Sequence, residues 1–356
     1  MTKQLRNDIL KKVKEVEKIC QKIGLWVSFY PEQLDLSIIR DSEEGTSIRI
    51  SDAYELAKAL SKLTILRSLS VHIKNCIIEG SGATAFAKAL SKLIELEKLK
   101  LIFENNNIGD FGINVLARSL SKLTKLRKLE ISFQSNKIGD FGAHAIAEAI
   151  SKLTKLSELR IDFWNNRIGD PGMCALAEAL SKLTKLSILE IHFTWNKVGD
   201  SGILALGKAL SKLAELRILE MHFSENKIGD SGAYALAEAL SNLTKLSKLT
   251  MYFRGNRISD RGACALAKAL SKLTNLNELD IDFRNNKIGD VGIAAFAEEL
   301  PKLTKLKILY VDFSGNNIGA SGICAFAKAI YKLSKLCLFR IDLTNEDIKI
   351  FFRRFL

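Results

Sequence analysis

The chain has 356 residues and carries a formal net charge of +13 at pH 7. Of its six cysteines, Cys174, Cys264 and Cys324 occupy the same position of a thirty-residue repeat, in copies too far apart for a bridge, and no CxxC pair occurs. We therefore expect no disulfide framework and a reducing, cytoplasmic location. No stretch is long and apolar enough to span a membrane, and only three prolines occur, without a linker-like tract, so we expect a single domain.

Residues 1–24 are polar and rich in lysine, with apolar residues at helical spacing, which predicts an amphipathic helix. No uninterrupted apolar run follows the charges, so this helix is not a secretory signal. We expect it to cap the open end of the repeats that follow, and a membrane-surface helix is the alternative. Residues 25–50 are expected to form short strands around Pro31 and a degenerate half-repeat.

From residue 51 to residue 345 the sequence repeats a pattern of thirty residues, and the copy at 126–155 shows its parts. Leu129 and Phe133 belong to an apolar series that ends in strict alternation, which predicts a strand with one buried face. Asp140 precedes an Ala-rich amphipathic stretch and is predicted to cap that helix through its carboxylate. Each repeat is therefore expected to consist of one strand and one helix.

Two positions of the repeat carry the same residue in nearly every copy, and each set of equivalent residues is called a column. They are the Asn column, Asn106, Asn136, Asn166, Asn196, Asn226, Asn256, Asn286 and Asn316, and the Gly column, Gly82, Gly112, Gly142, Gly172, Gly202, Gly232, Gly262, Gly292 and Gly322. A buried Asn beside each strand is expected to satisfy backbone groups of the next turn, so that the Asn side chains form a ladder. Gly near the helix start is expected to let the helix approach the sheet closely. We interpret both columns as structural rather than catalytic.

The pattern LxxLxIxFxxNxIGDxG, followed by an Ala/Leu helix, resembles leucine-rich repeats of the ribonuclease-inhibitor type. That group includes ribonuclease inhibitor, the sensing regions of nucleotide-binding immune receptors and the Ran GTPase activators. The resemblance implies an α/β fold, a leucine-rich-repeat solenoid with a parallel sheet on its concave face and helices on its convex face. Packed helices need more room than paired strands, which also predicts this curvature. One departure is an extra alternating pair that contains Phe133, which predicts a longer or bulged strand.

Three parts of the chain are therefore expected. Residues 1–50 form an N-terminal capping helix and half-repeat, residues 51–345 form the solenoid, and residues 346–356 form a C-terminal capping helix. This last helix is expected to turn four apolar residues onto the final repeat, namely Ile348, Phe351, Phe352 and Phe355.

A search for catalytic motifs is negative, since GxxxxGK[ST], GxSxG and HExxH are absent. We therefore predict that the protein is not an enzyme and needs no cofactor. His192 and His222 occupy the same outward position in adjacent repeats, next to Glu190 and Glu220. Such a set could hold zinc. Duplication of one repeat produces the same pattern, however, so we favour an ordinary binding surface and predict no metal.

Positions that differ among the repeats indicate function, because the fold does not require a particular residue there. These positions concentrate on the outward face of the strands, where exposed Trp, Tyr and Arg are typical anchors of protein interfaces. Unselected drift on a solvated sheet is the alternative. The candidate protein-binding residues are Arg160, Asp162, Trp164, Glu190, His192, Trp195, Glu220, His222, Tyr252, Arg254, Asp280, Asp282, Arg284, Tyr310 and Asp312.

Charge is distributed unevenly in the predicted fold. The outward strand columns, with Glu225, hold ten acidic and six basic residues, so the excess of basic residues lies elsewhere. It lies in two columns, one at the helix ends with Lys62, Lys92, Lys122, Lys152, Lys182, Lys212, Lys272, Lys302 and Lys332, and one at the opposite sheet edge with Lys137, Arg167, Lys197, Lys227, Arg257 and Lys287. Lysine at a helix C-terminus complements the helix dipole, and nucleic acid could bind only through these Lys-rich edges.

The function predicted from these observations is a non-enzymatic protein–protein interaction scaffold that binds a protein partner on its concave face. The first alternative is a GTPase-activating protein of the Ran-directed type, which rests on the family resemblance alone. Members of that group typically carry an acidic C-terminal tail, whereas this chain ends in FRRFL. The second alternative is a structural component of a large ribonucleoprotein assembly, held through the Lys-rich edges. The identity of the partner and the oligomeric state stay open.

Overall fold

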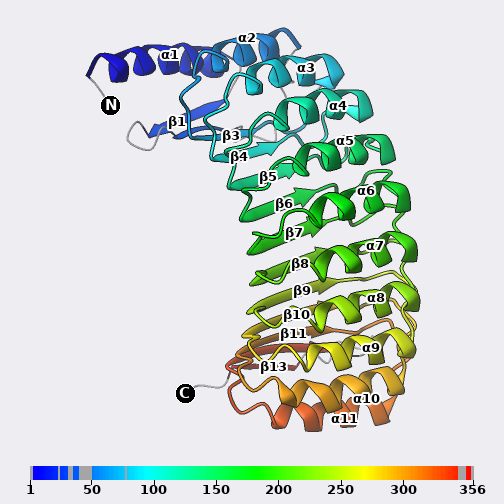
Figure 1. The fold of residues 1–356 in the computed structure, drawn as a ribbon. Coiled ribbons are helices and arrows are strands. Elements are labelled where there is room, and N and C mark those ends of the chain that lie inside the picture. Colours follow the sequence, from blue (N-terminus) through cyan, green and yellow to red (C-terminus); the bar gives the residue numbers. More distant parts are fainter. Residues whose placement is uncertain are drawn as a thin grey trace. The chain divides into compact units, whose positions relative to one another are not determined.

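A computed structural model describes residues 3–22, 25–30, 35–39, 50–76, 78–343 and 350–353 (Figure 1). The chain divides into two compact units, Met1–Arg167 and Ile168–Leu356, and each is described by itself. Among the helices of the described residues, none combines the length and apolar character that a membrane crossing requires.

The first unit alternates helices and strands. Its elements are α1 (Lys3–Lys22), β1 (Trp26–Tyr30), β2 (Asp35–Ile39), α2 (Ile50–Leu60), β3 (Ser68–His72), α3 (Glu79–Leu90), β4 (Lys98–Ile102), α4 (Gly109–Leu120), β5 (Lys128–Ser132), α5 (Asp140–Ile150) and β6 (Glu158–Asp162). Strands β1 and β2 pair antiparallel, and β2 to β6 pair parallel in sequence order. Equivalent residues of successive repeats are paired, as Leu99 is with Leu129.

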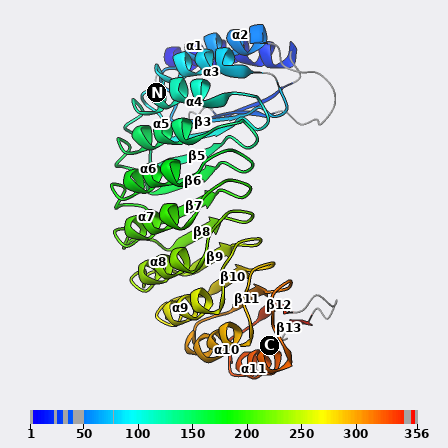
Figure 2. The same cartoon turned by 90° about the vertical axis from the view of Figure 1, so that its right-hand side faces the viewer.

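The second unit continues the same alternation. Its elements are α6 (Asp170–Leu180), β7 (Ile188–His192), α7 (Asp200–Leu210), β8 (Ile218–His222), α8 (Asp230–Leu240), β9 (Lys248–Tyr252), α9 (Asp260–Leu270), β10 (Glu278–Asp282), α10 (Asp290–Glu299), η1 (Leu300–Lys302), β11 (Ile308–Asp312), α11 (Ala320–Tyr331), β12 (Leu338–Asp342) and β13 (Ile350–Arg353). Strands β7 to β12 pair parallel in sequence order. Within each unit the helices line one side of the sheet (Figure 2).

The core of each unit lies between the sheet and the helices. Leu129 and Ile131 of β5 are buried, whereas the intervening Glu130 is only half-buried, as the alternating pattern predicts. A phenylalanine follows each of the strands β4 to β11 and, within each unit, packs on its counterpart in the next repeat, so that the ring centroids of Phe193 and Phe223 lie 5.6 Å apart. These rings are fully buried and join successive repeats into one core.

The extra residue pair before the Asn column lengthens the pairing between strands. Beyond the end of β4, the Phe103 N–H donates to the Ser132 oxygen and the Asn105 N–H donates to the Gln134 oxygen. The next residue, Ser135, then turns the chain with a φ of 53°. The expected lengthening is therefore found, and it ends in a left-handed turn.

The Asn side chains form the expected ladder, but each one bonds to backbone groups of the preceding repeat and not, as the sequence predicted, to those of the next turn. Asn136 Oδ1 accepts from the N–H groups of Asn106 and Ile108, both at 3.1 Å. Asn136 Nδ2 donates to the Phe103 oxygen at 2.6 Å. Asn136 is fully buried, so these bonds satisfy backbone groups that water cannot reach.

The Asp column caps helices differently from the prediction. Asp140 is the first residue of α5, and the N-cap position is held by Gly139 without a side-chain bond. The cap comes from the preceding repeat, because Asp110 Oδ1 accepts from the Gly139 N–H at 2.7 Å and from the Gly142 N–H at 3.1 Å. A carboxylate of one repeat thus satisfies the free N–H groups of the next helix.

The same contact explains most of the Gly column, although not Gly82 and Gly112, where a Cβ atom would meet an isoleucine side chain at 2.5 Å instead. A Cβ atom at Gly142 would lie 2.6 Å from Asp110 Oδ1 and 2.7 Å from the Ile138 side chain. Glycine therefore admits the capping carboxylate of the preceding repeat, and this close contact replaces the helix-to-sheet approach that the sequence suggested.

The two ends of the chain differ in character. The apolar side of α1 is buried through Val13 and Val16, and Lys62 of the segment after α2 binds Glu15 with 2.6 Å between Nζ and Oε1.

At the C-terminal end, the described residues of the predicted capping helix form a strand instead, since β13 pairs antiparallel with β12. The unpaired edge of β12 offers backbone groups that a short alternating segment can satisfy. The predicted packing of Ile348, Phe351, Phe352 and Phe355 stays a prediction, because Ile348, Phe355 and the side chains of the other two lie outside what the structure describes.

Candidate functional site

The outer sheet face, meaning the side of the strands away from the helices, brings the predicted binding residues of the second unit together. Strands β7 to β11 are in register, so equivalent side chains lie next to one another. Glu190 pairs with Glu220, His192 with His222, and His222 in turn with Tyr252. The opposite side of these strands is occupied by the core, which forces the polar side chains toward solvent.

Aromatic rings form a continuous row across three of these strands. The rings of His192 and His222 are stacked with centroids 3.8 Å apart, and the Tyr252 ring meets His222 edge-on at 4.6 Å. Tyr252 Oη donates to Asp280 Oδ2 at 2.7 Å, which extends the row to β10. Burial and the Asp280 carboxylate raise the pKa of Tyr252, so the phenol stays protonated and keeps donating.

Acidic side chains beside this row are held by Lys248. Its Nζ lies 3.0 Å from Glu220 Oε1 and 3.2 Å from Glu278 Oε1. His222 Nε2 lies 3.8 Å from Glu220 Oε2, which is beyond an ordinary hydrogen bond. His222 and, after it, Lys248 favour the charged carboxylate, and they lower the pKa of Glu220 to about 2 although burial opposes this.

A second charged group lies further along the outer sheet face. The Arg284 guanidinium donates two hydrogen bonds to the Asp282 carboxylate, from Nε to Oδ1 at 2.9 Å and from Nη2 to Oδ2 at 2.6 Å. Its Nε also lies 3.4 Å from Asp312 Oδ2 on the next strand. Arg254 Nε lies 3.7 Å from Glu225 Oε1. These side chains are fixed by one another before any partner arrives.

Trp195 stands at the turn after β7 with 56% of its surface exposed. Its φ is 59°, a left-handed conformation that is unusual for a bulky residue. Other repeats place Asn165, Asn285 or Gly255 at this position, and these residue types accept the conformation more easily. Trp195 thus combines an exposed ring with a backbone conformation that tryptophan does not favour.

Three of the predicted residues lie in the first unit. The Trp164 side chain is exposed, with Trp164 39% accessible, and the backbone N–H of this residue donates to Asp162 Oδ1 at 2.9 Å. Arg160 Nη1 lies 3.9 Å from Glu130 Oε2 on the neighbouring strand. Asp162 also accepts from the Gln134 amide. Tyr310, in the second unit, pairs with Asp280 across β10 and β11.

Sequence reasoning missed one column of this face. Lys248 and Glu278 begin their strands, two residues before the first column that was considered, and Lys128 and Glu158 form an ion pair at the same position in the first unit. The period of two residues places them on the same side of the sheet. Extending the alternation by one step would have found them.

Exposed apolar residues on the helix side were missed as well. Phe111 and Phe141 follow the Asp column at the starts of α4 and α5 and are largely exposed. Other copies place Pro171, Ser201 or Ser231 there. Like the positions on the outer sheet face, this position varies among the repeats. A comparison of every variable position of the repeat would therefore have identified it.

Charge divides between the faces. In the second unit the outer sheet face holds eight acidic and four basic residues, namely Glu190, Glu220, Glu225, Glu278, Asp280, Asp282, Asp312 and Asp342 against Lys248, Arg254, Arg284 and Arg340. At the helix ends, Lys152 and Lys182 bind Glu148 and Glu178 one turn earlier, each with 3.2 Å between Nζ and Oε1. This pairing and the helix dipole account for the lysine column in structural terms.

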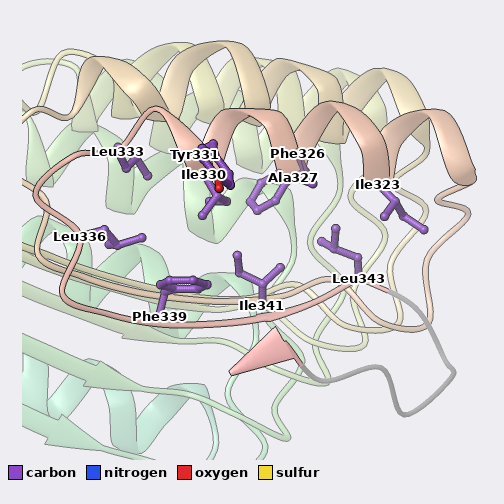
Figure 3. Close-up of a pocket in the computed structure, with 10 residues that line it drawn as sticks. All are labelled: Ile323, Phe326, Ala327, Ile330, Tyr331, Leu333, Leu336, Phe339, Ile341 and Leu343. Atoms are coloured by element: carbon purple, nitrogen blue, oxygen red, sulfur yellow. The ribbon is translucent and has the colours of Figure 1, made fainter. Parts of the chain in front are cut away.

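An apolar cavity of about 420 Å³ lies between α11 and β12 (Figure 3). Its lining consists of Ile323, Phe326, Ala327, Ile330, Tyr331, Leu333, Leu336, Phe339, Ile341 and Leu343. Most of these residues occupy core positions of the last described repeat, whereas Tyr331 is 88% exposed. The cavity brings no set of polar groups together, so we interpret it as the end of the core rather than as the functional site.

The repeats also match known sequences. A family model described as Leucine Rich repeat matches residues 183–207, 218–237, 272–297 and 302–327. The chain carries leucine-rich repeats. Each matched stretch begins near a strand and ends in the following helix, so the predicted fold class, a leucine-rich-repeat solenoid with repeats of about thirty residues, is confirmed. The matches do not distinguish the ribonuclease-inhibitor type among leucine-rich-repeat proteins.

Two solved structures match the chain at low sequence identity and with TM-scores below 0.5. An internalin from Listeria monocytogenes is 20% identical, with 94% of each chain covered and a TM-score of 0.43. A plant ice-binding protein is 16% identical, with 88% of this chain and 87% of that chain covered and a TM-score of 0.45. A search among curated proteins finds no match.

Proposed function

We propose that this leucine-rich-repeat protein is a non-enzymatic interaction scaffold that binds a protein partner on the outer sheet face of its second unit. The observation that carries the proposal is the row of His192, His222, Tyr252 and Asp280, which runs across four adjacent strands beside the exposed Trp195. Aromatic and charged groups gathered in this way are typical of interface anchors.

Prior ordering of the side chains supports binding. Fixing a flexible side chain on association costs about 0.5–1.5 kcal/mol. Arg284 is already held by Asp282 and Asp312, and Lys248 is held by two glutamates. The outer sheet face can therefore meet a partner with little further loss of side-chain freedom.

The charge of this surface favours a basic partner. Acidic residues outnumber basic residues two to one on the outer sheet face of the second unit, although the whole chain carries +13. A partner with Lys and Arg at its surface would be attracted there and oriented by this separation of charge. Nucleic acid would be repelled from the same surface.

The remaining proposals concern subtype and compartment. The strand, Asn and helix order supports membership of the ribonuclease-inhibitor type. All six cysteines are free thiols, and burial together with Glu17 raises the pKa of Cys20 to about 12, which keeps that thiol unreactive. Free thiols support the proposed cytoplasmic location.

Affinity capture with matched variants tests the proposed surface. We expect the native chain and a helix-side variant, Leu204→Ala/Tyr234→Ala, to capture the same protein from nuclease-treated extract. A Trp195→Ala/Tyr252→Ala/Arg284→Ala variant should lose it, and titration with the purified partner should show at least about a tenfold weaker Kd for each anchor removed. Circular dichroism establishes that the variants are folded.

Three results would contradict the proposal. Equal capture by the sheet-face variant would remove the outer sheet face as the binding site. Capture that nuclease treatment abolishes would point to a ribonucleoprotein assembly held through the Lys-rich edges. Faster GTP hydrolysis by a captured GTPase would point to the Ran-directed type of activity.

A further inference from the structure

We propose that His192, His222 and Glu220 form a binding site for one zinc ion on the outer sheet face. The site uses two imidazole nitrogens and one carboxylate oxygen, a ligand set that zinc accepts readily. It needs no protein partner, so it goes beyond the proposed scaffold function. The register of the strands and the unpartnered Nε2 atom of His222 both support it.

The backbone brings the three residues together. β7 and β8 are parallel and in register, so His192 and His222 are direct neighbours, and Glu220 lies two residues before His222 on the same side of the strand. The candidate ligand atoms of all three residues lie within 4.8 Å of one another. Two nitrogens bound to one tetrahedral zinc lie about 3.3 Å apart, given Zn–N bonds of about 2.05 Å. Small side-chain rotations therefore suffice to close the site.

The Nε2 atom of His222 provides the strongest indication. It is buried and has no hydrogen-bond partner among the described residues. The nearest carboxylate atom, Glu220 Oε2, is 3.8 Å away. A buried ring nitrogen without a partner costs free energy, and a metal ion between Nε2 and Oε2 would satisfy both atoms.

Neighbouring residues orient the carboxylate ligand. Lys248 Nζ binds Glu220 Oε1 at 3.0 Å, which leaves Oε2 directed toward His222. Lys248 also binds Glu278, so its own charge is shared between two carboxylates. The edge of Tyr252 packs on the His222 ring and limits its rotation. Such outer groups fix ligand geometry in metal sites.

The local charge favours a cation. Glu190, Glu220, Glu278 and Asp280 lie on the same face of β7, β8 and β10 as the two histidines, and Lys248 of β9 forms ion pairs with two of these carboxylates. The net charge of the four acidic side chains and Lys248 is negative when the carboxyls are ionised. A divalent ion would thus gain both ligand bonds and a favourable field.

Cobalt and zinc titrations of the purified chain test the site. We expect Co²⁺ to bind with one ion per chain and to give the intense visible absorption of tetrahedral cobalt, and Zn²⁺ to displace it. His192→Asn, His222→Asn and Glu220→Gln should each weaken binding at least about tenfold, and Lys248→Ala should weaken it less. His72→Asn and His144→Asn are matched controls that should bind like the native chain.

Thermal unfolding with and without Zn²⁺ gives a second measure. Zinc should raise the Tm of the native chain and of both control variants, and it should not raise the Tm of His222→Asn. Lack of stoichiometric binding by the folded native chain would overturn the proposal. Binding that survives in a His192→Asn/His222→Asn variant would overturn it too, because the ion would then be held elsewhere.

Discussion

Trp195 combines an exposed ring with a backbone conformation that costs free energy. A left-handed backbone conformation at a non-glycine residue costs about 1 kcal/mol or more of folding free energy, and Asn tolerates this conformation better than Trp does. We expect Trp195→Asn to raise the free energy of unfolding by about 1 kcal/mol, measured by urea denaturation. The reverse change in the first unit, Asn165→Trp, should lower it. A destabilised Trp195→Asn variant would show that packing of the ring outweighs the strain.

Glu220 gives the fold a dependence on pH. Its pKa is lowered in the folded protein from 4.5 to about 2, so the carboxylate stabilises the fold above about pH 4.5, and this contribution is lost as the pH falls toward 2. Glu220→Gln should therefore be less stable than the native chain at neutral pH, and the difference should shrink on acidification. Urea denaturation between about pH 7 and pH 3 measures it. A difference that stays constant over this range would contradict the assignment, and Glu148→Gln on the helix side is the control.

The carboxylate caps join successive repeats at the level of whole elements. Asp200 Oδ1 accepts from the N–H groups of Gly229 and Gly232, at 2.7 and 3.0 Å, at the start of α8. Asp200→Ala should destabilise the protein by about 1 kcal/mol, as the loss of a helix cap does. Gly232→Ala should destabilise it as well, because the new Cβ would lie 2.8 Å from Asp200 Oδ1.

A double-mutant cycle separates the two effects. In the Asp200→Ala background the carboxylate that obstructs the new methyl group is gone, so Gly232→Ala should cost less there than in the native chain. Additive costs, measured by denaturant unfolding, would show that the Ile228 side chain, at 3.0 Å from the same Cβ, is the real obstacle.

The elements of the repeats could be predicted from the sequence because alternation and helical spacing recur at a fixed period. The strand at Lys128–Ser132 and the helix at Asp140–Ile150 follow directly from it. The helix that each Asp caps could not be predicted. The sequence pattern is the same whether the Asp carboxylate caps its own helix or the helix of the next repeat. At the C-terminal end, residues 350–353 carry a short apolar run that suits a helix or a strand, and the free edge of β12 decides for the strand.

The candidate site was predictable in part for a related reason. The alternation placed His192, His222 and Tyr252 on one face, and the register of the strands confirms that they are neighbours. Ring stacking, the bond from Tyr252 to Asp280 and the bridging position of Lys248 depend on side-chain torsions, which periodicity does not determine.

At the scale of the whole molecule, the repeats share their structural columns and differ on their outer surfaces. Each repeat bonds to its immediate neighbours through the Asn ladder, the Asp caps and the Phe row. Stability in such an array is close to a sum over repeats and their interfaces. The proposed zinc site is local by contrast, because His192, His222 and Glu220 lie in only two repeats. Stability and binding should therefore respond differently to the loss of a repeat.

Deletion of single repeats tests this separation. Removing residues 193–222 takes out β8 with two of the three proposed zinc ligands, and removing residues 253–282 takes out β10 but keeps all three ligands and Lys248. Both deletions join equivalent positions of the pattern, so we expect both chains to fold with similar Tm values, measured by circular dichroism. Only the chain without 253–282 should bind one cobalt ion. If just one of the two chains folds, the repeats are not interchangeable, and if both bind cobalt, the ion does not depend on His222.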